Sequence, residues 1–219
     1  MKNIRTAEFN LKGLTPLLMH ADDVEASDLL KDWRKSPGNK NQSVAGDDRS
    51  PAWTWQTYWY LDEKGNFSIP SDNLMRCLCK AGAKIILKKQ TSFKELTQTG
   101  LCLPSDTLDF RNAGSSVPVT EFVEHRDEKF ADQKKRAQKA GFDLLVKRAS
   151  VGQSKHVRVR PMFRSWSASG TIQVTAQEFD SEKLQELFEL AGTVGLGDWR
   201  PGSKTPGRFG MFEATVKFK

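Results

Sequence analysis

The chain has 219 residues, of which 37% are hydrophobic and 28% charged, and its formal net charge is +7. A chain of this length can bury roughly 70% of its unfolded surface, so folding requires neither disulfides nor a metal. No apolar run approaches the roughly 18 residues of a membrane span, and the three cysteines lack zinc-site spacing. We therefore expect a cytoplasmic protein with free thiols, no cofactor, no metal and no membrane contact, and the charge favours a polyanionic partner.

The N-terminal quarter begins with a predicted strand. Apolar residues alternate over residues 5–14, which indicates one buried and one exposed face. Residues 20–51 are polar, and their second half has the composition of a mobile loop. We interpret them as an insertion into the fold.

The segment 52–61, "AWTWQTYWYL", is unusually aromatic. Trp53, Trp55 and Trp59 recur at period two, which predicts a strand with these rings on one face. That strand is either an arm of a core or interface hairpin or a base-stacking platform. Its aromatic surface exceeds what one small sheet needs, so we expect it to contact further copies of the chain.

A helix is predicted to begin near Ser71, a plausible N-cap that follows a turn and a short strand. Its apolar residues lie on one side, and Arg76 and Lys80 lie outside that stripe. The predicted buried stripe consists of Leu74, Cys77, Leu78, Ala81 and Ile85. Residues 100–154 have partly helical composition, and we interpret them as a second insertion.

The last third gives the clearest pattern. It predicts a strand over 155–163, a turn over 165–170 and a returning strand over 171–176. Asp180 should cap a helix over 181–192 that stops at Gly192, and alternation over 208–218 indicates a final strand.

The predicted order is strand, helix, strand, strand, helix, strand. This is the ferredoxin-like, RRM-like β-α-β-β-α-β arrangement, an α+β fold with both helices on one face of an antiparallel sheet. We expect one domain over 1–219. Its core comprises 1–19, 52–99 and 155–219, and its large insertions are 20–51 and 100–154.

Between the last helix and the last strand lies a glycine-rich, basic loop. Glycines suit positive φ values or the close approach of a ligand, so the loop is a candidate phosphate cradle that a Cβ would block. Trp199 could stack on a base. The RNA-binding candidates here are Gly195, Gly197, Trp199, Arg200, Lys204, Gly207, Arg208 and Gly210, and on the first helix Arg76 and Lys80.

A second basic stretch lies between residues 134 and 164, where Asp143 is the only acid. Such asymmetry is typical of contacts to a phosphate backbone, whereas a solvated face usually mixes both signs. The candidates are Lys134, Lys135, Arg136, Lys147, Arg148, Lys155, His156, Arg158 and Arg160.

Two segments resemble a known family. "GTVGLGDWRPGSKTPGRFGMFEA", after an apolar helix, resembles the C-terminal glycine-rich loop of the RAMP superfamily, the ferredoxin-like RNA-binding proteins of CRISPR systems. "GNFSIPSDNLMRCLCKAG" is similar to the segment that enters the first helix in backbone subunits of multi-subunit effector complexes, and "GDDRSP" at 46–51 is similar to their "DSP". "SDNLMRC" departs from their small-residue "SSLKG" pattern.

The resemblance implies a subunit that coats single-stranded guide RNA, oligomerises along it and joins other effector-complex subunits in antiviral defence. Two kinds of catalysis remain open. His20 could act as the base of a metal-independent endoribonuclease, and Asp47 or Asp48 could hold a divalent cation for cleavage of a target. A single-stranded nucleic-acid-binding protein of a phage or mobile element is a further alternative.

Overall fold

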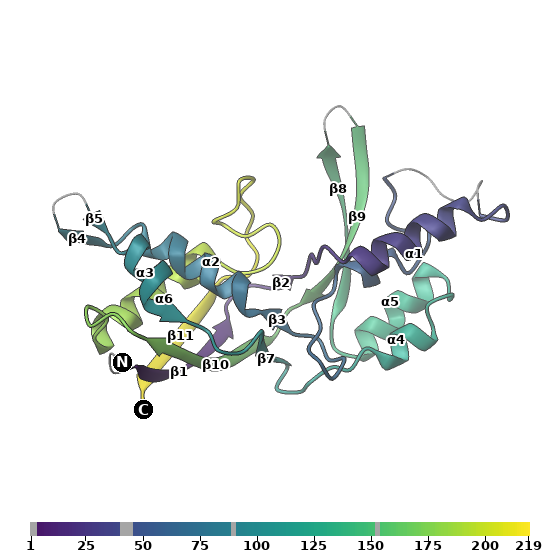
Figure 1. The fold of residues 1–219 in the computed structure, drawn as a ribbon. Coiled ribbons are helices and arrows are strands. Elements are labelled where there is room, and N and C mark those ends of the chain that lie inside the picture. The colour runs from purple at the N-terminus through teal and green to yellow at the C-terminus, as the bar shows by residue number, and fades with distance from the viewer. Residues whose placement is uncertain (1–3, 40–45, 89–90, 152–153) are drawn as a thin grey trace. The chain divides into compact units, whose positions relative to one another are not determined.

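The structure is a computed structural model that describes residues 4–39, 46–88, 91–151 and 154–219 (Figure 1). The chain divides into two compact units, and each is described by itself. The first unit comprises Met1–Leu17, Ser68–Ser116 and Arg164–Lys219. The second unit comprises Leu18–Phe67 and Val117–Phe163. Both contain helices and antiparallel strands, so the chain has a mixed α+β fold.

The first unit is built on a six-stranded sheet in the order β11-β1-β10-β7-β3, with β6 pairing β10. Its strands are β1 (Arg5–Gly13), β3 (Ile69–Pro70), β6 (Leu101–Cys102), β7 (Thr107–Asn112), β10 (Trp166–Val174) and β11 (Phe212–Phe218). Its helices are α2 (Ser71–Gly82), α3 (Lys94–Gly100) and α6 (Ser181–Val194). A separate hairpin joins β4 (Ile86–Lys88) to β5 (Thr91–Ser92).

One face of this sheet is covered by helices (Figure 1). Ala7, Phe9 and Leu11 of β1 are buried and alternate with exposed neighbours, which confirms the predicted strand. Phe9 packs against Phe188 of α6, with ring centroids 5.4 Å apart. The five residues of the predicted helical stripe are all buried, although Ile85 lies beyond the end of α2. Period-two and period-3.6 patterns therefore identified the elements that meet in this core.

The ends of the two long helices differ in part from expectation. Asp180 caps α6 by accepting a hydrogen bond from the Lys183 amide at 2.8 Å, as predicted. Gly192 does not end α6, however. A Cβ there would overlap the carbonyl oxygen of Phe212, so Gly192 allows β11 to approach, and the helix ends at Gly195 with φ of 79°. Ser71 is the first residue of α2 rather than its N-cap.

The outer edge of β11 is closed by a side chain of α6. The Gln185 amide nitrogen donates to the carbonyl oxygen of Ala214 at 2.9 Å. Its amide oxygen accepts from the backbone N–H of Val216 at 3.0 Å. One carboxamide thus satisfies a donor and an acceptor of the edge strand.

The predicted hairpin between 155–163 and 171–176 is wrong. The chain turns at Arg164 and Ser165, and residues 166–174 form one strand without a turn at 165–170. That strand, β10, pairs with β1 and β7, whereas 154–163 pairs with 143–151 in the second unit. Residues 101–112, which we expected in an insertion, belong to the main sheet of the first unit. Both misplaced pairings are long-range, and local patterns do not encode them.

The second unit contains a three-stranded sheet in the order β2-β9-β8. These strands are β2 (Leu17–Leu18), β8 (Asp143–Val151) and β9 (Ser154–Phe163), and β8 and β9 form a long antiparallel arm (Figure 1). Around the sheet lie α1 (Val24–Lys35), the 3-10 helix η1 (Thr54–Tyr58), α4 (Thr120–Glu124) and α5 (Phe130–Lys139). The helix α1 was missed within the expected insertion 20–51.

The aromatic segment is not a strand, and its tryptophans do not form a contact surface. Residues 54–58 make a 3-10 helix, and Trp53, Trp55 and Trp59 are buried. Trp55 is fully buried against Trp59 and Phe122, and its Nε1 donates to Oε1 of Gln133 at 2.6 Å. The expected contact between copies through these rings is therefore wrong, because the rings form the core of the second unit.

Candidate nucleic-acid interface

The loop between α6 and β11 is held by its own backbone hydrogen bonds. Leu196 N–H donates to Gly210 O at 2.9 Å, and Gly202 N–H donates to Val194 O at 2.8 Å. Gly195, Gly197 and Gly210 have positive φ values, so the sharp turns explain part of the glycine content. The loop is a folded element rather than a flexible connection.

Four of the five loop glycines do not contribute to the expected phosphate cradle. The N–H groups of Gly195, Gly202, Gly207 and Gly210 all donate to carbonyl groups of the chain, which leaves none of the four for a phosphate. A Cβ at Gly207 would overlap the carbonyl oxygen of Trp199, and one at Gly210 would overlap that of Leu196. The space in front of these two glycines is filled by the loop itself.

Replacing Gly207 by valine should therefore destabilise the protein, by about 1–3 kcal/mol, because overpacked sites must shift their neighbours. The matched control is Gly38→Val, since a Cβ at Gly38 meets nothing within 4 Å. Thermal unfolding of both variants checks the difference. An unchanged melting temperature for Gly207→Val would contradict the close packing described here.

The loop after α6 lies beside α2, and a basic side chain of α2 contacts it. Lys80 Nζ donates to the carbonyl oxygen of Gly202 at 2.9 Å, and the Cys77 thiol lies 3.3 Å from that of Gly195. Arg200, Lys80 and Lys84 all act electrostatically on Cys77, whose pKa burial nevertheless raises to about 12. We call the basic residues of α2 and of this loop, together with Lys84 just beyond α2, the α2–loop surface: Arg76, Lys80, Lys84, Arg200, Lys204 and Arg208.

The basic side chains of the α2–loop surface differ from those of the second unit in their hydrogen-bond and ion-pair partners. Arg200 is half-buried and the other five residues are exposed. Lys80 donates to the carbonyl oxygen of Gly202, and Arg200 donates to that of Gly197. In the part of the chain that the structure describes, none of the six forms an ion pair with a carboxylate. Lys84 was missed as a candidate; it lies beyond the end of α2, in the turn that follows the helix.

Two basic residues of α5 are different, because carboxylates pair with Arg136 and Lys135. Arg136 contacts Glu121 and Glu128, both at 2.6 Å, and these carboxylates raise the pKa of Arg136. Lys135 lies 3.5 Å from Asp132. Lys134 is half-buried. Arg136 in particular serves the structure of the second unit and is not free for a phosphate.

The β8–β9 arm holds the remaining candidates. Lys147 and Arg148 are exposed on β8. The ring of His156 is half-buried beside Gly46, and no hydrogen-bond partner of its buried Nδ1 is found among the described residues. The side chain of Lys155 lies outside the described residues. Arg158 and Arg160 both point to one carboxylate, that of Asp48.

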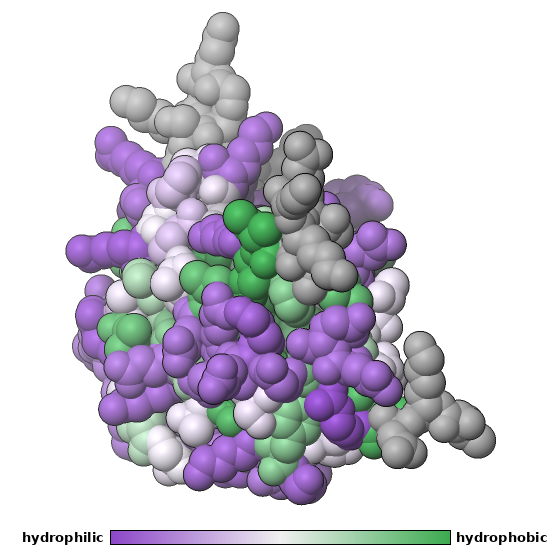
Figure 2. Space-filling model, turned by 90° about the vertical axis from the view of Figure 1, so that its left-hand side faces the viewer, coloured by the Kyte–Doolittle hydropathy of each residue, from purple (hydrophilic) through white to green (hydrophobic). Residues whose placement is uncertain are grey.

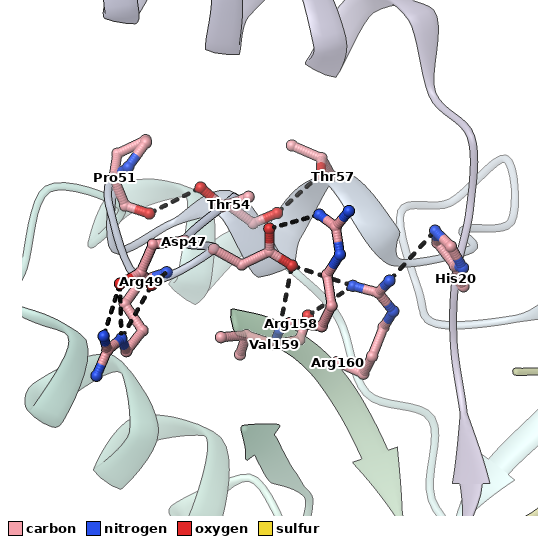
Figure 3. Close-up of polar contacts among 10 residues, drawn as sticks. His20, Asp47, Arg49, Pro51, Thr54, Thr57, Arg158, Val159 and Arg160 are labelled. Carbon is pink, nitrogen blue, oxygen red and sulfur yellow. Dashed lines mark hydrogen bonds and ion pairs between the residues drawn. The ribbon is translucent and has the colours of Figure 1, made fainter. Parts of the chain in front are cut away.

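Asp48 is the centre of a buried charge cluster, and its partners Arg158, Val159 and Arg160 are labelled in Figure 3. It is 2% exposed, and its carboxylate accepts hydrogen bonds from Arg158 Nη1 at 3.1 Å, Arg160 Nη1 at 3.2 Å and Val159 N–H at 3.1 Å. The segment around it also pairs with β9, through Asp48 N–H to Val157 O and Val157 N–H to Gly46 O. Asp48 therefore joins residues 46–48 to β9.

This arrangement does not suit a cation site. Both carboxylate oxygens of Asp48 already face guanidinium groups, which would repel a metal ion. Asp47 bonds to the Arg49 side chain, and this hydrogen bond lowers the pKa of Asp47. Over residues 4–39, 46–88, 91–151 and 154–219, no group of three or more His, Cys, Asp or Glu could hold a metal ion.

His20 lies at the other end of the same cluster (Figure 3). Its ring is exposed, and its Nε2 lies 3.4 Å from Nη2 of Arg160. Arginine only donates hydrogen bonds, so Nε2 must be the acceptor in this contact. Arg160 also lies 3.9 Å above the ring of Tyr58. The lone pair that a general base needs is thus engaged by Arg160.

The uncovered face of the first unit's sheet forms a shallow hollow of about 430 Å³. Its polar lining comprises Asn10, Lys12, Asp109, Arg111, Ser167, Ser169, Glu213 and Thr215. No aromatic side chain lines the hollow, so it lacks the rings on which RRM sheets stack bases. Figure 2, which views the left-hand side of Figure 1, shows a surface that is mostly hydrophilic, with hydrophobic side chains in small separate patches.

Comparison with known proteins gives no assignment: no family model matches the chain, and no curated protein matches it. No helix in the described segments is long and apolar enough to cross a membrane. Arguments about function therefore rest on the residues and their geometry.

Proposed function

We propose that this protein binds single-stranded RNA through its phosphate backbone and that the α2–loop surface makes the contact. The observation that carries this proposal is the set of six basic side chains for which the described residues provide no carboxylate partner. Uncompensated cations on neighbouring elements repel one another, and a polyanion relieves that repulsion while releasing its own counterions. Arg136, Arg158 and Arg160 of the second unit already pair with carboxylates, so their charges do not require a polyanion for compensation.

Backbone contacts fit this surface better than base recognition does. Arginine and lysine side chains bind phosphates without reading sequence. The sheet hollow offers no stacking ring, whereas Trp199 is half-buried within the loop and lies next to Arg200. Trp199 is the residue we assign to stacking on a base beside the phosphate contacts.

The topology of the first unit supports the choice of RNA. Its elements β1, α2, β7, β10, α6 and β11 follow the order β-α-β-β-α-β, and four of them form the sheet order β11-β1-β10-β7. We take this as a ferredoxin-like core of the RAMP type. Coating of a CRISPR guide by a cytoplasmic effector-complex subunit, as the sequence resemblance implies, is part of the same proposal.

The test removes three charges from the α2–loop surface. We expect the variant Arg76→Ala, Lys204→Ala, Arg208→Ala to bind single-stranded RNA about 100-fold more weakly, with a salt slope smaller by about two, because each phosphate contact contributes roughly 0.7 to that slope. Fluorescence anisotropy over a range of salt concentrations measures both quantities.

The matched control is Lys12→Ala, Lys139→Ala, Lys217→Ala, which lowers the net charge by the same amount at exposed positions elsewhere. The proposal holds if only the first variant loses affinity. Equal loss in both variants indicates a general charge effect and contradicts the assigned surface. Single-stranded DNA and duplex RNA of the same sequence serve as competitors, and equal binding of all three contradicts the assignment to single-stranded RNA.

A further inference from the structure

The sheet hollow of the first unit exists because the middle strand carries short side chains on its uncovered face. Ser167 and Ser169 of β10 line the hollow, whereas their neighbours Trp166 and Ala168 are buried. Strand positions are usually filled by β-branched or aromatic residues, which cover more of a sheet. Two successive serines on this face leave a space of about 430 Å³ beside the longer side chains of β1, β7 and β11.

The strand register arranges the polar lining of the hollow in two rows across the sheet. In the order β11-β1-β10-β7, the first row is Glu213, Lys12, Ser167 and Arg111, and the second row is Thr215, Asn10, Ser169 and Asp109. Neighbouring residues on one face of a strand are about 7 Å apart. A ligand that contacts both rows must therefore carry two polar groups at about this separation.

Most of these side chains have no partner within the described residues. Asp109 and Arg111 pair with each other at 3.0 Å, and Nη1 of Arg111 donates to Ser116 at 2.8 Å, which orients the guanidinium group. Over the described part of the chain, no hydrogen bond or ion pair involves the side chains of the other six: Asn10, Lys12, Ser167, Ser169, Glu213 and Thr215. The exposed face of an antiparallel sheet is normally polar, so polarity alone does not identify a site. Here the six groups converge from three strands on one hollow, and a concave surface with convergent polar groups is typical of a small-ligand site.

The two rows offer different chemistry. Lys12 and Arg111 lie two strands apart, at about 10 Å between their Cα atoms, and the hydroxyl group of Ser167 lies between them. One tetrahedral oxyanion in this position accepts hydrogen bonds from both cations and from the hydroxyl group. In the second row, the amide of Asn10 donates and accepts, and the carboxylate of Asp109 accepts from hydroxyl groups.

We propose that the sheet hollow binds a phosphorylated sugar, with the phosphate between Lys12 and Arg111 and the sugar hydroxyl groups on Asn10 and Asp109. A pentose phosphate carries its phosphate and its far hydroxyl groups at a separation that suits the two rows. The carboxylate and amino groups of an α-amino acid share one carbon atom and are too close together to reach both. No aromatic side chain lines the hollow, so it provides no ring on which a nucleobase could stack. The site goes beyond the proposed RNA contact, since none of its residues belongs to the α2–loop surface.

The test titrates the isotopically labelled protein with ribose 5-phosphate, inorganic phosphate or ribose, without RNA, and follows the backbone amide signals by NMR. Ribose 5-phosphate should shift amide signals of β1, β7 and β10. It should bind at least about tenfold more tightly than phosphate or ribose, because its two groups engage both rows at once. Absence of shifts, shifts centred on the α2–loop surface, or equal binding of the three probes would each overturn the proposal.

Two variants test the assigned groups. Ser167→Val fills the floor of the hollow with a residue that strands favour, and Lys12→Ala removes one cation. Each should weaken binding of ribose 5-phosphate about tenfold, the effect expected for one hydrogen bond to a charged group. The matched controls Thr171→Val and Lys217→Ala lie on the same sheet face outside the hollow and should bind as the wild type does.

The amide spectrum of each variant also shows whether it is folded. Wild-type binding by a folded Ser167→Val or Lys12→Ala variant, or equal loss in the controls, contradicts the assigned site. Single-stranded RNA in excess should leave ribose 5-phosphate bound. Displacement by RNA would show that the hollow takes the sugar-phosphate backbone of RNA, which overturns the assignment to a free sugar phosphate. The titrations without RNA stand apart from the proposed function, so failure of one is distinct from failure of the other.

Discussion

Replacing Trp55 by alanine is expected to lower the free energy of unfolding by about 3–5 kcal/mol, the range for large-to-small changes of buried aromatic residues. Trp55 is fully buried and touches the rings of Trp59, Phe122 and Phe142. The change also leaves Oε1 of Gln133 without its donor, in a residue that is itself buried. Chemical denaturation, followed by intrinsic fluorescence and circular dichroism, measures the loss.

The control for this variant is Trp33→Ala on α1. Trp33 is half-buried, and alanine favours a helix, so the expected loss is about 1 kcal/mol or less. If Trp55→Ala unfolded at the wild-type denaturant concentration while changing the association of copies, the segment 53–59 would be an interface after all. That outcome would contradict the core described here.

A similar loss, about 3–5 kcal/mol, is expected for Asp48→Ala, because removing one member of a buried ion pair leaves the other charge uncompensated. Two guanidinium groups depend on this carboxylate, and Arg160 is only 3% exposed. Val159 N–H loses its acceptor as well. Residues 46–48 should then detach from β9, which limited proteolysis at this segment would detect.

The neighbouring residue provides the control. Asp47 pairs with Arg49 at 2.6 Å, but the Arg49 side chain is 52% exposed. Exposed ion pairs contribute about 1 kcal/mol or less, so Asp47→Ala should unfold almost as the wild type does. Equal behaviour of the two alanine variants would show that the Asp48 cluster is not structural and would return Asp48 to consideration as a functional residue.

The elements with local periodicity were predictable. The alternation in β1 and the apolar stripe of α2 identify buried faces because neighbouring positions along one element already differ in burial. In the aromatic segment, tryptophans alternate with other residues, but residues 54–57 are all buried. The alternation therefore does not separate a buried face from an exposed one. Tertiary burial overrode a pattern that is normally typical of a strand.

The sequence indicated which basic residues could form the candidate site, but it did not indicate which of them form ion pairs with carboxylates. Lys204 and Arg160 look alike in the sequence, yet one is exposed without an ion pair and the other is buried against Asp48. The separation of 112 residues between Arg160 and Asp48 puts that contact beyond any local pattern. The glycines were misinterpreted for the same reason, since the atoms that fill the space before Gly207 belong to Trp199 in a turn that the sequence does not specify.

The carboxamide of Gln185 affects whether copies of this chain can aggregate through their sheet edges at high concentration. An edge strand is a template on which a neighbour can add its own strand, the usual route to fibrous aggregates. Gln185 occupies the edge groups of Ala214 and Val216, and the opposite end of the sheet is the two-residue β3, which ends in Pro70. Proline offers no N–H for a ladder. If copies gather along one RNA strand, as we propose, these protected edges keep them from joining through a shared sheet, so added salt should separate them.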